Sequence, residues 1–235
     1  DEGLRSNVLN EQALTGDLAE AMENGQIRIY LQPQMDGEGN VLGAEALVRW
    51  QHPGRGMLAP GEFIGIFEKN GSIVRLDCHV WELACRQLRR WKDQGREDLY
   101  ISVNISPMDL YFIDLFKTFA GLVEKYGISP GNLKLEITET AMMSDLEKQL
   151  QMISKLREAG FVVEMDDFGS GYSSLNMLKD IQVDVLKIDM AFLGETEDKL
   201  RAQKILRTIV ELSRQLEVPV ISEGVETQEP VEFLR

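Results

Sequence analysis

Apolar, strand-like runs alternate with helix-like segments along most of this 235-residue chain. Period-two patterns and β-branched residues predict strands at 27–35, 41–50, 99–106, 132–138, 161–166, 183–189 and 218–224. The first two strands are joined by a turn at GEGN and form a predicted antiparallel pair. Later strands are separated by predicted helices at 58–71, 74–95, 108–126, 145–159, 172–179 and 194–216, and a polar, helix-compatible segment covers 7–24. Because a parallel return needs a crossover of about a dozen residues, the pattern predicts an α/β fold around a parallel sheet.

Polar residues occupy the ends of these strands. They are Asn104, Glu136, Asp166, Lys187 with Asp189, and Glu223, and Glu45 lies within the second strand. Carboxylates at the mouths of buried strands are costly to desolvate unless a metal or a cation lies among them. In a closed α/β barrel all these ends meet on one face, so the side chains are predicted to converge there. Taken singly, each acidic residue could instead be a helix cap or a solvated loop residue.

The charge balance limits the partners of the chain. It has 25 basic and 39 acidic residues and a formal net charge of −14. This excess argues against long nucleic acid as a partner, and an anionic substrate would need cations supplied locally. No run approaches the roughly 18 apolar residues of a membrane-spanning helix. We expect a cytoplasmic domain, or the cytoplasmic part of a membrane-anchored protein.

Six short motifs follow one another along the chain: GAEALVRW, SVNISP, LEITET, DDFGSGYSSL, VLKID and EGVET. The ordered set resembles the signature of the EAL-domain phosphodiesterases, which hydrolyse the bacterial second messenger cyclic di-GMP. The resemblance runs from about residue 26 to the C-terminus. It implies a TIM-like (β/α)8 barrel with an antiparallel first strand, linear pGpG as product, dependence on a divalent metal, and frequent homodimerisation.

The candidate ligands indicate the class of metal. They are carboxylates and one amide carbonyl, with no His or Cys nearby in the motifs, which disfavours zinc and fits Mg²⁺ or Mn²⁺. Two such ions about 3.5–4 Å apart can serve phosphodiester hydrolysis. The resemblance implies a first ion held by Glu45, Asn104, Glu136 and Asp166, and a second held by Asp166, Asp167 and Glu223.

Three further residues are predicted to act in catalysis. Strand alternation points Lys187 and Asp189 to the same side, where Lys187 would hold the attacking water, and the alternative is an internal ion pair. Glu223 is either the general base or a ligand that lowers the pKa of the water, and the sequence leaves both open. The resemblance implies that Glu139 anchors the loop after the fifth strand, whose Gly169 and Gly171 permit it to fold over the metals.

Substrate contacts are predicted on the hairpin and near the C-terminus. Arg49 lies four residues after Glu45 on the same strand, and the resemblance implies that it forks onto a phosphate; a salt bridge to a barrel acid is the alternative. Gln32 matches the substrate-contacting glutamine of the family, although it could simply satisfy the hairpin backbone. Asp189 and Glu226 complete the predicted substrate-binding set.

The domain organisation is predicted as a lead-in helix over 1–24 and a phosphodiesterase barrel over 25–235. The lead-in is typical of a connection from an upstream domain, and the resemblance implies that this partner is a sensory or diguanylate cyclase domain. The sequence stops before an eighth barrel strand, so we expect the natural protein to continue by at least one helix and one strand. Two other functions are compatible with the motifs: a degenerate receptor that binds cyclic di-GMP without cleaving it, and a hydrolase of another phosphoester.

Overall fold

The structure, a computed structural model, describes residues 2–142, 145–168, 182–189 and 199–223. Its centre is one mixed sheet, in which β1 and β2 are antiparallel. From β2 onward the strands are parallel, in the order β2, β4, β5, β6, β7 and β8. The short β3 pairs with the last residues of β2. The strands are β1 (Ile27–Met35), β2 (Val41–His52), β3 (Gly56–Leu58), β4 (Tyr100–Ile105), β5 (Leu133–Thr138), β6 (Val162–Asp166), β7 (Val185–Asp189) and β8 (Val220–Glu223). The predicted α/β fold, its seven main strands and the antiparallel first strand are confirmed.

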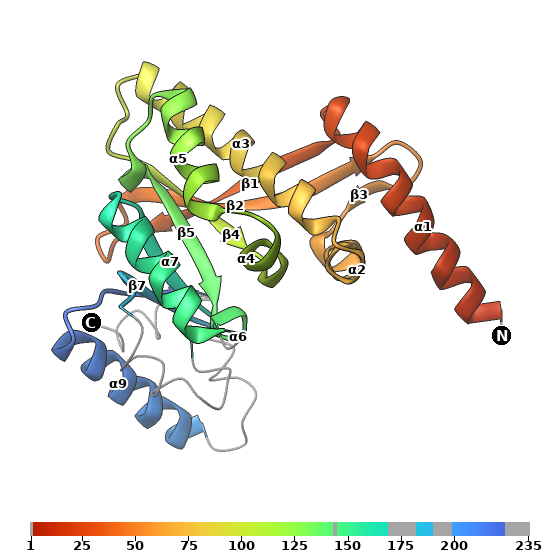
Figure 1. Cartoon of the computed structure of the whole chain (residues 1–235). Coiled ribbons are helices and arrows are strands. Elements are labelled where there is room, and N and C mark those ends of the chain that lie inside the picture. Colours follow the sequence, from red (N-terminus) through yellow and green to blue (C-terminus); the bar gives the residue numbers. More distant parts are fainter. Residues whose placement is uncertain (1, 143–144, 169–181, 190–198, 224–235) are drawn as a thin grey trace.

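Helices connect β2 to β4, β4 to β5, β5 to β6 and β7 to β8, and α3, α5 and α7 lie along the outer face of the sheet (Figure 1). The helical elements are α1 (Glu2–Glu23), η1 (Pro60–Glu62), α2 (Ile64–Asn70), α3 (Ile73–Asp93), α4 (Pro107–Phe112), α5 (Leu115–Tyr126), η2 (Pro130–Asn132), α6 (Glu139–Met142), α7 (Leu146–Glu158) and α9 (Lys199–Gln215). The predicted helix over 172–179 lies outside the described residues. Among the residues that are described, no helix is both long and apolar enough to cross a bilayer.

The single helix predicted over 108–126 is wrong, because the chain forms two helices there. Ile113 is extended, with φ −128° and ψ 151°, and it ends α4. Asp114 then caps α5 by accepting a hydrogen bond from the Lys117 backbone N–H. A short polar residue is a strong N-cap, so the capping preference of Asp114 divides the segment in two.

Two large hydrophobic clusters and a small one around Ile188 and Leu206 are present among the described residues. The largest lies between the sheet and helices α3, α5 and α7. The second joins the α1 residues Leu14 and Leu18 to Trp50, Phe63 and Phe67 at the far end of the hairpin. The second half of α1 therefore packs onto the body of the domain, and the boundary at residue 24 stays a prediction.

Candidate active site

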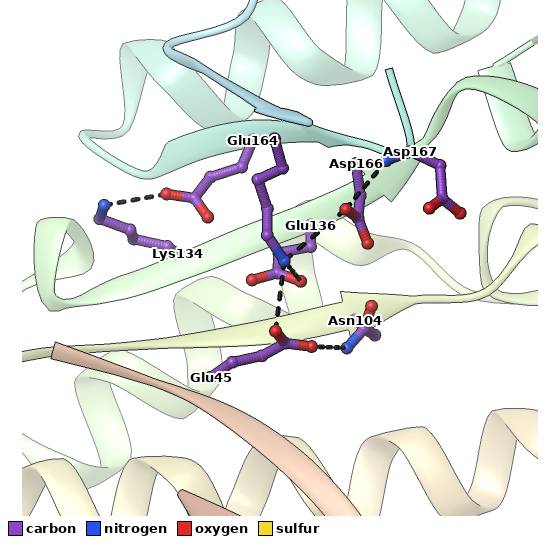
Figure 2. A network of polar contacts seen from close by, with 8 residues as sticks. Glu45, Asn104, Lys134, Glu136, Glu164, Asp166 and Asp167 are labelled. Atoms are coloured by element: carbon purple, nitrogen blue, oxygen red, sulfur yellow. Dashed lines mark hydrogen bonds and ion pairs between the residues drawn. The ribbon is translucent and has the colours of Figure 1, made fainter. Parts of the chain in front are cut away.

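The strand register brings the predicted site residues to one end of the sheet. Glu45 of β2 is opposite Ser102 of β4, and Asn104 of β4 is opposite Glu136 of β5. Side chains of alternate residues point to the same face, and the carboxyl ends of parallel strands share one edge. The carboxylates of Glu45, Glu136 and Asp166 accordingly converge in Figure 2.

Lys187 of β7 lies at the centre of this carboxylate cluster. Its Nζ is 2.6 Å from Glu136 Oε2, 3.3 Å from Glu45 Oε2 and 3.7 Å from Asp166 Oδ1. The lysine side chain is 0% exposed and its three partners are 0–16% exposed. One buried ammonium group thus lies among three carboxyl groups that the chain brings together from three other strands. The internal ion pair left open for Lys187 is present, and Glu136 is its nearest partner among the described side chains.

The protonation of these groups follows from burial and mutual charge. Burial raises the pKa of Glu136 to about 8, although the Lys187 ammonium opposes this increase. Burial also raises the pKa of Asp166, again against the effect of Lys187. Burial alone would lower the pKa of Lys187, but Glu136, Glu45 and Asp166 together raise it above its usual range. Lys187 is therefore a permanent cation at neutral pH and can only donate hydrogen bonds.

Asn104 is held from both sides at the exposed rim of the site. Its Nδ2 donates a hydrogen bond to Glu45 Oε1 at 3.0 Å. Its backbone carbonyl accepts a hydrogen bond at 3.0 Å from the indole N–H of Trp81, a buried residue of α3. The side-chain amide is thus oriented so that its carbonyl oxygen faces away from Glu45. Trp81 was not among the residues predicted for the site, so its hydrogen bond to Asn104 was missed.

Asp166 is the last residue of β6, and Asp167 follows it. The Asp167 backbone N–H donates a 2.9 Å hydrogen bond to Asp166 Oδ1, and Asp167 is exposed with a left-handed φ of 55°. Such a φ is uncommon for a residue other than glycine and turns the chain sharply at the end of the strand. Glu139 is buried at the start of α6, directly after β5. Most of the loop that Glu139 is predicted to anchor, including Gly169 and Gly171, lies outside the described residues, so the anchoring role stays a prediction.

The hairpin residues lie on the same face as Glu45. Gln32 of β1 is directly opposite Glu45 and is exposed. The Arg49 guanidinium donates from Nη1 to the Val48 carbonyl at 2.8 Å and lies 5.6 Å from the centre of the Tyr30 ring. Tyr30 was not predicted as a site residue; a tyrosine in period-two alternation with Gln32 was the available signal. No salt bridge joins Arg49 to an acid among the residues described.

Three predicted site residues are only partly placed. Asp189 and Glu223 are backbone neighbours in the β7–β8 ladder, at the same end of the sheet as Asp166. Their side chains are not among those described. Glu226 lies outside the described residues altogether.

The available ligands fit a hard divalent cation. Carboxylate and amide oxygens are the donors that Mg²⁺ and Mn²⁺ prefer. Glu136 Oε1 is buried, and no hydrogen-bond donor among the described residues reaches it. A buried carboxylate oxygen is normally satisfied, so this atom is suited to accept a cation. Within the same residues, no group of three acidic, His or Cys side chains already has metal-binding spacing. The Lys187 ammonium lies among the carboxyl groups of Glu45, Glu136 and Asp166.

The described residues thus form an α/β sheet with a carboxylate-rich rim, at the edge where active sites of α/β barrels are built. A model of the EAL domain matches residues 15–235, and the chain belongs to the EAL domain family. The bifunctional diguanylate cyclase/cyclic di-GMP phosphodiesterase MucR of Pseudomonas aeruginosa is 36% identical over 100% of this chain and 34% of its own length. The cyclic di-GMP phosphodiesterase PdeR of Escherichia coli is 35% identical over 94% of this chain and 33% of its own length.

The chain thus spans about a third of the length of these two curated relatives. Among solved structures, that of the PaMucR phosphodiesterase in a c-di-GMP complex aligns with a TM-score of 0.88 and 37% identity, covering 94% of this chain and 90% of that chain. The EAL domain of FimX from Xanthomonas citri aligns with a TM-score of 0.85 at 21% identity, and this supports the fold alone. The family predicted from the six motifs is confirmed.

Proposed function

We propose that this chain hydrolyses cyclic di-GMP to linear pGpG in a reaction that depends on Mg²⁺ or Mn²⁺. The observation that carries the proposal is the convergence of three carboxylates from different strands around the Lys187 ammonium, with Asn104 bonded to one of them. The chain belongs to a family whose curated members include cyclic di-GMP phosphodiesterases, and one solved relative is a c-di-GMP complex. Members of this family generally depend on a metal.

The predicted site residues have separate roles in a two-metal hydrolysis. Glu45, Asn104, Glu136 and Asp166 would hold one ion, and Asp166, Asp167 and Glu223 the other. When bound, the two ions neutralise charge on the phosphoryl oxygens and lower the pKa of the attacking water. Lys187 orients that water by donating a hydrogen bond. Because Lys187 stays protonated, it cannot accept the proton, and we assign that step to Glu223.

The substrate is bound by residues around the metals. Arg49 forks onto a phosphate, with its guanidinium kept in place by the Val48 carbonyl and the Tyr30 ring. Gln32, Asp189 and Glu226 provide the remaining contacts. Glu139 anchors the loop that follows β6.

The proposal also includes the cellular location, the oligomeric state and the neighbouring domains of the chain. We place it in the cytoplasm as a homodimer, downstream of a sensory or diguanylate cyclase domain. Long nucleic acid is not a substrate, because the net charge of −14 repels an extended phosphate backbone.

The test is incubation of the protein with cyclic di-GMP and Mg²⁺ or Mn²⁺, with chromatographic detection of pGpG. A parallel reaction contains a chelator. The variant Glu45→Gln removes a ligand charge while keeping the size of the side chain, and Glu124→Gln makes the same change at an exposed position on α5. We expect pGpG from the unsubstituted protein and from Glu124→Gln, and none with Glu45→Gln or with chelator.

Two results would contradict the proposal in different ways. Tight binding of cyclic di-GMP without product in either metal would indicate a receptor. Failure to bind cyclic di-GMP, together with hydrolysis of a generic phosphodiester such as bis-p-nitrophenyl phosphate, would indicate a different substrate.

A further inference from the structure

A second set of residues lies one layer deeper in the sheet than the carboxylate cluster. Gly43, Lys134 and Glu164 each precede a predicted metal ligand by two positions on the same strand, which places them on the same face. Tyr100 of β4 is directly opposite Gly43. We call Gly43, Tyr100, Lys134 and Glu164 the floor layer.

A buried ion pair forms the core of the floor layer. Lys134 Nζ donates a hydrogen bond to Glu164 Oε1 at 2.9 Å (Figure 2). The side chains are 13% and 0% exposed. The same ammonium lies 3.5 Å from the centre of the Tyr100 ring, so a second interaction fixes its position. A desolvated pair with two separate constraints has little freedom to rearrange.

The ring of Tyr100 also contacts the strand that carries Glu45. A Cβ atom on Gly43 would lie 2.5 Å from Tyr100 Cδ2 and 2.5 Å from the Tyr100 carbonyl oxygen. Only glycine permits β4 to come this close to β2 here. The floor layer therefore runs without interruption from β2 through β4 and β5 to β6, directly below Glu45, Glu136 and Asp166.

Glu164 and Glu136 are direct neighbours in the parallel ladder of β5 and β6. Both are buried, and each has one oxygen that no donor among the described residues reaches. Two like charges in this arrangement repel each other. Burial is the largest cause that raises the pKa of Tyr100 to about 12, and the charges of Glu164 and then Glu136 add to this increase. Both carboxylates therefore interact electrostatically with Tyr100.

Each member of the ion pair would disturb the site if it were alone. Without Lys134, the Glu164 carboxylate would repel Glu136 and attract the metal ion that Glu136 is proposed to bind. Unpaired, Lys134 could bind Glu136, which lies two positions away on its own strand and face. Bound to each other, both groups are kept away from the carboxylates above them.

We propose that Lys134 and Glu164 are positioning residues whose mutual ion pair keeps both charges out of the metal site and leaves Glu136 available to a divalent cation. The proposal rests on the metal site of the proposed function. It concerns two residues that contact neither the substrate nor, in that proposal, the metal.

The test measures Mn²⁺ binding directly, by titration calorimetry on the full chain without substrate. Lys134→Met leaves Glu164 unpaired, and Glu164→Gln leaves Lys134 without an anion. Each single variant is expected to weaken Mn²⁺ binding about 10–100-fold, the usual effect of removing a residue that supports metal ligands. The double variant Lys134→Met/Glu164→Gln removes both charges, and its affinity should return close to that of the unsubstituted protein.

A matched control separates this role from a general loss of stability. Lys125→Met removes an ion pair of similar length, 2.7 Å to Glu82, from the surface between α3 and α5, and should leave Mn²⁺ binding unchanged. Melting curves report folding for every variant. If Lys134→Met does not fold, Glu164→Gln and the double variant still decide the question.

The outcomes distinguish the two proposals. Absence of Mn²⁺ binding by the unsubstituted protein overturns the metal site itself. Normal binding by the folded single variants overturns the positioning role, and so does a double variant as weak as the single ones.

Discussion

Replacing Lys187 with methionine removes the ammonium group that lies among three carboxylates in the described part of the site. The variant Lys187→Met retains most of the apolar volume of the side chain and deletes the ammonium group. Glu136, at 2.6 Å and with 0% side-chain exposure, loses its ion-pair partner, and Glu45 and Asp166 lose a contact at 3.3 Å and 3.7 Å. The change therefore tests how strongly the site depends on one buried charge.

The size of the effect follows from the burial of the pair. Breaking a buried ion pair by removal of one partner costs about 3–5 kcal/mol, because the other charge is left uncompensated. For a domain of 150–250 residues, 1 kcal/mol corresponds to about 2–4 °C in melting temperature, so we expect a decrease of roughly 6–20 °C in a metal-free buffer. Added Mn²⁺ should recover part of this loss, since an ion that binds only the folded state stabilises it.

The assay is thermal unfolding followed by circular dichroism at neutral pH, once with chelator and once with Mn²⁺. Lys125→Met is the control, because it removes an exposed ion pair and should have little effect in either buffer. A melting temperature for Lys187→Met equal to that of the unsubstituted protein in chelator would refute the reasoning, since the three carboxylates would then not need the ammonium.

Three further predictions concern residues around the site. Trp81→Phe removes the indole N–H that donates a hydrogen bond to the Asn104 carbonyl. The loss of this donor should lower the free energy of unfolding by about 1–3 kcal/mol and the melting temperature, measured by calorimetry, by roughly 2–12 °C. Burial raises the pKa of Asp77 and of Asp109, so the folded protein retains protons that the unfolded chain releases above about pH 4, and stability falls as pH rises. Asp77→Asn should flatten that decrease in melting curves recorded from about pH 4 to pH 8; an unchanged slope would contradict the assignment. Gly43→Ala places a Cβ atom 2.5 Å from the Tyr100 carbonyl oxygen. We expect it to lower the free energy of unfolding, measured with denaturant, by about 1–3 kcal/mol. An unaltered denaturation midpoint would show that β2 and β4 move apart at little cost.

Much of the site followed from the sequence because two simple rules act together. Alternation along a strand determines which residues share a face, and parallel order brings the strand ends to one edge. These rules predict that Glu45, Asn104, Glu136 and Asp166 lie together. They needed no information about side-chain packing.

The specific partners could not be predicted in this way. Lys187 pairs with Glu136, which lies 51 positions earlier, and the choice among several carboxylates depends on strand register. The register is determined by the packing of all the strands and helices, which local patterns do not reveal.

Two misses had a signal in the sequence. In LKLEIT, Lys134 alternates with Glu136, and in VVEMDD, Glu164 alternates with Asp166, so both charged residues share a face with a predicted ligand. Charged residues on strands are usually exposed, and for that reason an internal pair was not expected. The division of the predicted helix at Asp114 likewise had a signal, since aspartate is a strong N-cap.

The central claim is that residues distant in sequence gather at one rim to bind divalent metal. The most direct measurement is a crystal structure of the protein with cyclic di-GMP and Mn²⁺, with data collected for the anomalous signal of manganese. The account predicts anomalous peaks bonded to Glu45, Asn104, Glu136 and Asp166, with a phosphate of the ligand beside them. Ligand bound elsewhere, or a rim in which Lys187 retains all three carboxylates and no manganese peak is present, would contradict it.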